Sequence, residues 1–361
     1  MNAMERFAPL HLAMPGDPVG LQIGRMDKPA RKVRLALDAS PMVIADACRD
    51  GVDLLLTHHA LLYRPLAKID TGTARGAALA LALRHDLAVY SAHTNLDIAD
   101  GGVNDVLTSL LGLRDTQVLE RMHVERLRKL VVFVPKTHHQ KVLDAVCQAG
   151  AGHIGAYSHC TFNTPGEGTF LPLEGTHPFI GEQGTVEHVQ EVRLETIVSE
   201  NQAESVVRAM LQAHPYEEVA YDLYPLEIMG KASGLGRVGN LMVPRRLEDF
   251  AQHCRDVLGL SHIRFSGDPE KMVERIAVIG GTGGKWVNKA IERGAEALLT
   301  SDCDHHLMAE AWQDGLAIVD ATHASLERPV LKRVQEVLAA ELSGAITIDV
   351  VEDSEDPYRW V

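Results

Sequence analysis

Residues 54–65 read LLLTHHALLYRP, and this stretch decides the fold class. Its leucines and its threonine are typical of a short buried strand, and two adjacent histidines, His58 and His59, follow where that strand should end. Ligand-binding groups in open α/β sheets collect at the carboxyl ends of the strands. The stretch therefore predicts an α/β sheet with a functional site at one edge.

Strand-like and helical patterns alternate on both sides of this stretch. Residues 33–40 predict a strand, and residues 41–51 predict a helix that Ser40 caps and Gly51 closes. Further predicted elements are helices at 75–86, 104–113, 247–260, 286–295, 305–315 and 323–344, and strands at 87–97 (running into a loop), 275–284, 296–302 and 316–322. Alternation of this kind predicts α/β architecture with crossover connections.

The pattern changes near residue 127. Residues 128–150 predict a strand and a helix, a Gly- and Thr-rich stretch follows, and residues 189–226 predict strand, helix and strand. This order resembles a ferredoxin-like module. We therefore predict an α+β domain at 127–226, inserted into an α/β core that comprises 1–126 and 227–361.

Composition narrows the functional classes. A hydrophobic content of 46% supports real cores, and a net charge of −14 argues against non-specific nucleic-acid binding. No run of about 18 apolar residues predicts a membrane span, and the first twenty residues do not resemble a signal peptide. Five cysteines, none close to another, fit a reducing cytoplasmic setting. Small anionic substrates stay open, because bound metal ions can override the global charge.

Histidine and acidic residues follow four of the predicted strands. They are His58 and His59; His93 and Asp97; Asp302, His305 and His306; and His323 with Glu327. Neighbouring side chains on extended backbone point to opposite sides, so two metal ions a few ångströms apart could each take one of the adjacent histidines. Imidazole and carboxylate ligands favour Zn, Fe, Mn or Co over Ca or Mg. A single histidine at a strand end is more often a surface group, but four such strand ends favour a metal site.

Three other motifs have competing interpretations. Residues 278–286, VIGGTGGKW, lack the spacing of a phosphate-binding loop and carry Trp286 where a hydroxyl is needed, which favours a tight turn. Residues 214–225, HPYEEVAYDLYP, predict either a second metal site or a turn into an edge strand. Cys303 is a buried small residue or, less favoured, a nucleophile or ligand.

The motifs, taken in order, resemble those of the Nif-three-like (NGG-one-interacting factor three-like) family. They are GDPVGLQIG (16–24), LLLTHHALLYRP (54–65), YSAHTNLDIADGGVNDVLTSLLGL (90–113), HPYEEVAYDLYPL (214–226), GLGRVGNL (234–241), IGGTGGKWVNKAIERGAEALLTSD (279–302) and DATHASLE (320–327). The resemblance is to the long bacterial members, the GTP cyclohydrolase 1 type 2 homologues. It implies a CutA- or PII-like insert and a homo-oligomer, a hexamer in such relatives.

The resemblance also implies a two-metal site. Its ligands would be His58, His59, Asp97, His323 and a bridging Glu327. His93 would lie beside the metal ligands or touch substrate. The chain departs from the family at Gly16 and Pro18 (usually Trp and Asn), at Asp304 and His305 (usually Lys and an aromatic residue) and at Thr322 (usually Gly). These departures change the wall of the pocket and leave the five ligands intact.

The sequence therefore predicts a dinuclear metal-dependent hydrolase with two divalent ions per chain, zinc being favoured over Fe, Mn or Co. His93 and His306 are the predicted catalytic residues, as groups that move a proton. The resemblance implies a small purine nucleotide such as GTP as substrate. The alternative is a metal-binding oligomeric scaffold or regulatory protein without catalytic activity.

Overall fold

The computed structural model describes residues 1–342, 344, 346–351 and 358. The chain forms two units: a core of Met1–His123 with Ser233–Val361, and an insert of Val124–Ala232. The predicted insert, 127–226, lies inside this range. Strands β5 (Arg114–Pro135) and β8 (Tyr221–Arg246) each run through a boundary between the units. Both are longer than their predicted strands, because one continuous strand serves both units.

The first sheet of the core contains the opening stretch. Its strands are β1 (Gly20–Ile23), β2 (Lys32–Ala36), β3 (Leu54–Thr57), β4 (Ala88–Ser91) and β13 (Thr347–Val350), in the order β1-β4-β3-β2-β13. All neighbours are parallel except β1 and β4. Helices α2 (Pro41–Arg49) and α3 (Ala74–Arg84) pack on each other and share a hydrophobic cluster with this sheet. Ser40 caps α2 as predicted, its Oγ accepting from the Val43 amide at 3.2 Å.

The second sheet of the core follows in the chain after the insert. Its strands are the core part of β8, then β10 (Met272–Thr282), β11 (Ala297–Ser301), β12 (Ala317–Ala321) and β9 (Arg264–Ser266). The three strands β10, β11 and β12 are parallel, and an antiparallel strand flanks them on each side. The helices of this half are α8 (Leu247–Val257), α9 (Val287–Glu292) and α10 (His305–Gln313). An α/β core was predicted and is confirmed, and the structure shows that it contains two separate sheets.

The helices of the core near the sheet edges differ from the prediction. The single helix predicted at 323–344 is two helices, α11 (His323–Glu327) and α12 (Pro329–Glu341). Pro329 has no amide hydrogen to donate, so it starts a helix more readily than it continues one. The remaining helices of the core are α1 (Asn2–Phe7), α4 (Thr94–Ile98), α5 (Val103–Leu110) and the 3-10 turns η1 (Leu10–Leu12) and η3 (Gly284–Trp286). The break leaves Glu327 at the end of one short helix.

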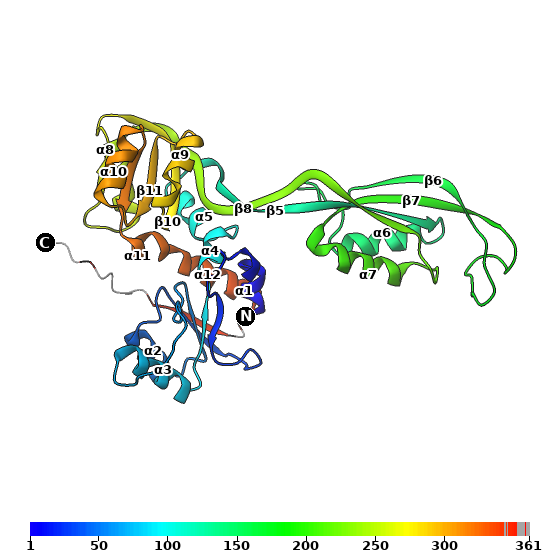
Figure 1. Cartoon of the computed structure of the whole chain (residues 1–361), viewed down its shortest axis with the longest axis horizontal. Coiled ribbons are helices and arrows are strands. Elements are labelled where there is room, and N and C mark those ends of the chain that lie inside the picture. Colours follow the sequence, from blue (N-terminus) through cyan, green and yellow to red (C-terminus); the bar gives the residue numbers. More distant parts are fainter. Residues whose placement is uncertain (343, 345, 352–357, 359–361) are drawn as a thin grey trace. The chain divides into compact units, whose positions relative to one another are not determined.

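The insert has the chain order β-α-β-β-α-β of a ferredoxin-like module. Its elements are the insert parts of β5 and β8, α6 (His139–Gln148), β6 (Thr161–Phe170), β7 (Glu187–Ser199), the 3-10 turn η2 (Glu200–Gln202) and α7 (Ala203–Ala213). The sheet order is β6-β7-β5-β8, with α6 and α7 together on one face (Figure 1). Strand β6 was not predicted; its Pro165 is tolerated because β6 is an edge strand.

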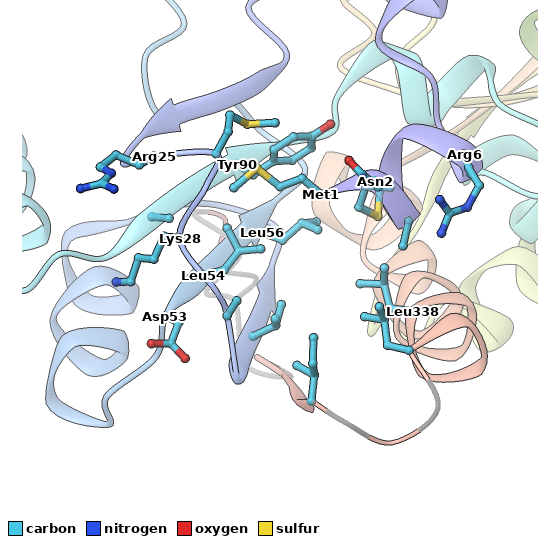
Figure 2. A pocket seen from close by; sticks show the side chains of 18 residues that line it. Met1, Asn2, Arg6, Arg25, Lys28, Asp53, Leu54, Leu56, Tyr90 and Leu338 are labelled. Atoms are coloured by element: carbon cyan, nitrogen blue, oxygen red, sulfur yellow. The ribbon is translucent and has the colours of Figure 1, made fainter.

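A cavity of about 310 Å³ lies in the core beside α1 and the first sheet (Figure 2). Its wall is mostly apolar, with Leu54, Leu56 and Tyr90 from the sheet. The basic side chains around it are already paired: Arg6 with Glu341 at 2.6 Å, Arg25 with Asp27 at 2.8 Å and Lys28 with Asp86 at 2.9 Å. The chain itself therefore neutralises the basic side chains that surround this cavity.

Among the helices of the described ranges, none is both long enough and apolar enough to cross a membrane. The cytoplasmic location stays a prediction.

Candidate metal centre

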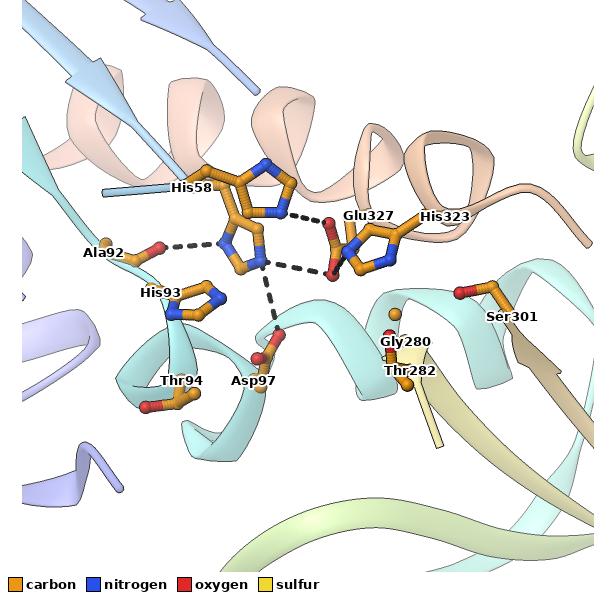
Figure 3. Close-up of polar contacts among 12 residues, drawn as sticks. His58, Ala92, His93, Thr94, Asp97, Gly280, Thr282, Ser301, His323 and Glu327 are labelled. Atoms are coloured by element: carbon orange, nitrogen blue, oxygen red, sulfur yellow. Dashed lines mark hydrogen bonds and ion pairs between the residues drawn. The ribbon is translucent and has the colours of Figure 1, made fainter. Parts of the chain in front are cut away.

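The predicted ligands come together at the carboxyl ends of the core strands (Figure 3). His58 and His59 follow β3, and Asp97 lies on α4, which begins just after β4. His323 opens α11, after β12, and Glu327 ends that helix. Three groups of side chains each have ligand atoms within 4.8 Å of one another: His58, Asp97 and Glu327; His59, His323 and Glu327; and His58, His59 and His93.

Glu327 lies at the centre of the cluster, in which His58, Asp97 and Glu327 are buried and the other histidines are partly exposed. Its Oε1 is 3.6 Å from His58 Nε2 and 3.1 Å from His323 Nε2, and its Oε2 is 2.9 Å from His59 Nε2. His58 Nε2 is also 3.6 Å from Asp97 Oδ1. Only 2% of Glu327 is exposed. Two groups of side chains therefore share the Glu327 carboxylate: one contains His58 and Asp97, and the other contains His59 and His323.

These atoms fit a metal ion better than they fit each other. His58 Nε2 and Asp97 Oδ1 are buried and have no hydrogen-bond partner, a costly state for polar atoms. Two ligands about 2.1 Å from one ion, at about 110° to each other, are roughly 3.4 Å apart. The observed separations of 2.9 to 3.6 Å bracket this value. The nitrogen and oxygen donors suit a divalent transition metal.

A second layer of oxygens fixes how the histidines point. In each of four histidines, Nδ1 lies within hydrogen-bond distance of such an oxygen. The pairs are His58 with the Ala92 carbonyl (2.9 Å), His59 with Asp38 (2.8 Å), His323 with Asp302 (2.6 Å) and His93 with Asp17 (2.9 Å). A hydrogen bond at Nδ1 leaves Nε2 as the nitrogen for a metal or substrate and fixes the ring orientation. None of these four oxygens was predicted from the sequence as a partner.

Asp302, the hydrogen-bond partner of His323, has an unusual backbone conformation. The sequence placed it among the strand-end groups, and the structure uses it to hold His323. Its φ is +60°, in the left-handed region that non-glycine residues rarely adopt. Its Oδ2 also accepts from the Thr282 hydroxyl at 2.6 Å. Burial alone would raise the pKa of Asp302, but the hydrogen bonds from Thr282 and His323 outweigh it and lower the pKa below its ordinary value.

Two glycines of the 278–286 stretch allow close packing, Gly281 against the cluster and Gly280 against α5. Gly281 has φ +67°, and a Cβ there would be 2.4 Å from Glu327 Oε1 and 3.3 Å from the His323 ring. A Cβ at Gly280 would be 2.4 Å from a methyl of Val103 on α5. Any larger residue at 281 would therefore push Glu327 out of place. This role was not predicted from the sequence, and the paired glycines at the end of strand β10 are the signal for it.

The histidines and carboxylates of the cluster shift one another's pKa. Burial would lower the pKa of His59, but Asp38 and Glu327 outweigh it and raise the pKa to about 10. The Glu327 hydrogen bond raises the pKa of His323 to about 9. Burial raises the pKa of Asp97 to about 6. Burial would also raise the pKa of Glu327, but the surrounding imidazoles lower it. Without a metal the histidines thus keep protons that an ion must displace.

The two predicted catalytic histidines lie in different surroundings. His93 belongs to one of the three groups, and its ring centroid is 5.2 Å from that of His58. Burial would raise the pKa of its partner Asp17, but hydrogen bonds from His93 and Thr94 lower it, so Asp17 stays a carboxylate. His306 lies in the first turn of α10, is exposed, and is in none of the three groups found among the described residues.

The competing interpretations of two motifs can also be compared with the structure. Both nitrogens of His214 are used locally: Nε2 lies 3.0 Å from the Phe133 carbonyl, and Nδ1 accepts from the Tyr216 amide at 3.1 Å. His214 is therefore part of a turn, and no metal-ligating group of the described residues includes it. Cys303 is 2% exposed, and burial raises the pKa of its thiol to about 12, which does not favour a nucleophile.

The departures from the family pattern also have places in the structure. Asp304 caps α10, its Oδ1 accepting from the Leu307 amide at 2.9 Å. Thr322 precedes α11 as its N-cap residue. Among the matching residues, the Gln22 amide donates to the Pro18 carbonyl at 2.6 Å and accepts from the Leu62 amide at 3.1 Å. Of the altered positions, Asp304 and Pro18 thus take part in local hydrogen bonds with their side chain and carbonyl, respectively.

Comparison with known proteins gives a consistent picture. The model of the family Duf34/NIF3 (NGG1p interacting factor 3) matches residues 1–357. The GTP cyclohydrolase 1 type 2 homolog of Halalkalibacterium halodurans is 47% identical over 100% of this chain and 98% of its own length. The protein of that name from Bacillus subtilis is 42% identical, over 100% and 97%. The crystal structure of a Bacillus cereus protein related to NIF3 superposes with a TM-score of 0.92 at 42% identity, covering 100% of this chain and 97% of that one.

Proposed function

This chain belongs to the Duf34/NIF3 family, and from that premise we propose that it is a metal-dependent hydrolase whose cluster binds two divalent ions. One observation carries the proposal: two groups of imidazole and carboxylate ligand atoms share Glu327, and His58 Nε2 and Asp97 Oδ1 of one group are buried without a hydrogen-bond partner. A carboxylate shared by two groups is the bridge that dinuclear hydrolytic sites require.

Each proposed ion has its own ligands. His58 and Asp97 would bind one ion, His59 and His323 would bind the other, and Glu327 would bridge the two. The mixed imidazole and carboxylate set suits zinc, with iron, manganese or cobalt next. When bound, such ions would polarise a substrate and make hydroxide available near neutral pH.

His93 and Asp17 form the part of the site that moves a proton. The Nδ1–H of His93 donates to the Asp17 carboxylate, so Nε2 is free to accept a proton from water or to return it to a leaving group. Asp17 stabilises the imidazolium that forms in this exchange. His306 stays a prediction as a second proton-transfer group; its side chain is exposed in the first turn of α10.

A purine nucleotide such as GTP is the proposed substrate, opened by hydrolysis at its imidazole ring. The support is the name that the relatives carry, GTP cyclohydrolase 1 type 2 homolog. The phosphates of such a substrate are negative, and so is the chain as a whole, at −14. The two ions would supply the local positive charge that the protein lacks.

Elemental analysis of protein purified without a His tag tests the proposal, for the wild type and for Glu327→Ala, with GTP consumption followed in parallel. Glu310→Ala, an exposed change on α10, is the control for loss of a carboxylate elsewhere. We expect about two equivalents of transition metal per wild-type chain and near zero in Glu327→Ala. Metal near zero in the wild type, unrestored by Zn, Mn or Fe, would overturn the proposal.

A second outcome would favour the scaffold instead. In that case the wild type holds metal, GTP and other phosphoesters are not consumed, and removal of the metal changes the oligomeric mass. Light scattering before and after chelation measures that mass and also tests the predicted homohexamer.

A further inference from the structure

The HPYEE motif at 214–218 forms one wall of a cavity in the insert. The His214 turn described above fixes the backbone there, and the next ring, Tyr216, faces the cavity. The Tyr216 hydroxyl donates to Glu191 Oε1 on β7 at 3.0 Å, which holds the ring in place. The motif that had no role in the metal centre therefore builds a second recess.

Aromatic rings make up much of this recess. The Tyr216 ring centroid is 5.8 Å from that of Phe170, at the end of β6, and 6.4 Å from that of Phe179, in the loop between β6 and β7. Phe179 also contacts the His138 ring edge-on at 5.2 Å. The volume is about 490 Å³, within the range of small-molecule sites. Half of Phe179 (52%) is exposed, so a ligand there would cover apolar surface.

The charges around the recess have one sign. Glu191, Glu217 and Glu218 line it, and the described lining residues include no lysine, arginine or histidine. Glu217 is held in place by the His177 amide, which donates to Oε1 at 2.9 Å. The cavity of the core differs in this respect, because it is lined by basic side chains, each of which has an acidic partner.

Aromatic faces and carboxylates together attract one kind of ligand. The face of an aromatic ring is negative and attracts a weakly hydrated cation, and nearby carboxylates add to that attraction. Anions are repelled, and a bare metal ion gains little from the rings. We propose that this cavity of the insert binds a small organic ammonium ion with an apolar body, Tyr216 supplying the ring face and Glu218 part of the charge.

A pair of probes that differ only in charge tests the proposal. Choline and its neutral carbon isostere, 3,3-dimethylbutan-1-ol, are titrated into the full-length protein by calorimetry. We expect choline to bind about tenfold more tightly than the alcohol. Tyr216→Leu should lose about tenfold in choline affinity, whereas Tyr216→Phe keeps the ring and should stay within about threefold.

Matched variants separate local charge from the charge of the whole chain. Glu218→Gln should weaken choline binding severalfold, and Glu227→Gln, an exposed change on β8 outside the cavity, should leave it unchanged. Equal binding of the two probes, or no binding of choline to the wild type, would overturn the proposal. So would a change of oligomeric mass in Phe179→Ser without choline binding, because the surface would then be a contact between copies of the chain.

Discussion

The candidate metal cluster of the core and the aromatic cavity of the insert both contain carboxylates, but they hold them differently. In the core, Asp97 and Glu327 are buried and face imidazole nitrogens at 2.9 to 3.6 Å. In the insert, Glu217 and Glu218 are exposed and stand beside aromatic rings. The sign of the charge is therefore the same in both places, and the surroundings of the charge differ.

That difference determines what each site can bind. Buried nitrogen and oxygen atoms without hydrogen bonds have lost their contacts with water, and binding an ion directly compensates for that loss. The cluster therefore favours a small metal ion. Exposed carboxylates keep their water, so the cavity gains mainly from covering rings and from charge at longer range. Metal binding by the cluster should accordingly be sensitive to the loss of a single ligand atom, whereas ligand binding by the cavity should tolerate small side-chain changes.

The same substitution in both places should give the largest contrast. Glu327→Gln keeps the shape of the side chain and removes the charge that both groups share, so metal affinity should fall by more than about 100-fold. Glu218→Gln should weaken choline binding only severalfold. Metal titration and calorimetry measure the two effects. If the two variants lost affinity by a similar factor, the distinction between a buried carboxylate that ligates an ion and an exposed carboxylate that acts at longer range would be contradicted.

Gly281→Ala should disturb the cluster without removing any ligand. The added Cβ would meet Glu327 Oε1 at 2.4 Å and also requires an alanine at φ +67°. We expect metal affinity to fall by tens of times, because the shared carboxylate must move. Gly315→Ala is the matched control, since its φ of +89° carries the same backbone cost with no atom within 4 Å of the added Cβ.

If Gly281→Ala and Gly315→Ala lose similar thermal stability and both keep full metal content, the close approach at Gly281 is irrelevant to the site. Melting curves and metal analysis of the two variants decide the matter.

Asp302→Asn should have a smaller effect than either change at the centre. The amide keeps most of the shape but no longer accepts from His323 Nδ1 as a charged group, so the ring is held less firmly. We expect metal affinity to fall about tenfold, which is typical for groups that orient a ligand. Asp304→Asn, two residues away at the cap of α10, should leave metal affinity unchanged. An equal loss in both variants would point to a general disturbance of this loop.

The smallest expected effect is a gradual change with pH in the metal-free protein. His59 and His323 have folded pKa values of about 10 and about 9, above the ordinary 6.5. A raised pKa stabilises the fold fully below pH 6.5, and that stabilisation is lost as the pH rises toward 10. Chelated protein should therefore unfold at lower denaturant concentration at pH 10 than at pH 7. In Glu327→Gln the difference in denaturant midpoint between pH 7 and pH 10 should be smaller. An equal difference would show that the Glu327 carboxylate is not the cause of the pH dependence.

The sequence predicted the parts of the site that strand ends determine. His58, His59 and Asp97 follow strands β3 and β4 of the first sheet, and His323 and Glu327 follow β12 of the second. Parallel pairing brings carboxyl ends together within one sheet, and tertiary packing brings the ends of the two sheets together. The family resemblance added the assignment of these residues as ligands. The partners at Nδ1 could not be predicted in the same way, because the Ala92 carbonyl and Asp38 become neighbours only through tertiary packing.

The secondary structure was predictable where burial gives the sequence a regular hydrophobic pattern, and less so where residues are exposed. Strand β6 has an exposed sequence of glycine, threonine and proline, so it carries no hydrophobic alternation. Strands β5 and β8 extend well beyond their predicted lengths, because their exposed positions do not mark where one unit ends. The position of Pro329 was visible in the sequence and marks the helix break that the prediction overlooked.

The two continuous strands also matter for how the chain assembles. The insert of about a hundred residues leaves the core on β5 and returns on β8, which are neighbours in the sheet. Once the insert has folded, these strands meet the core as the arms of a hairpin. Closing a loop costs about 0.6 kcal/mol more for each doubling of its length, so a four-residue turn in place of a hundred residues lowers that cost by about 3 kcal/mol. An insert that folds first is, for the rest of the chain, equivalent to a short turn.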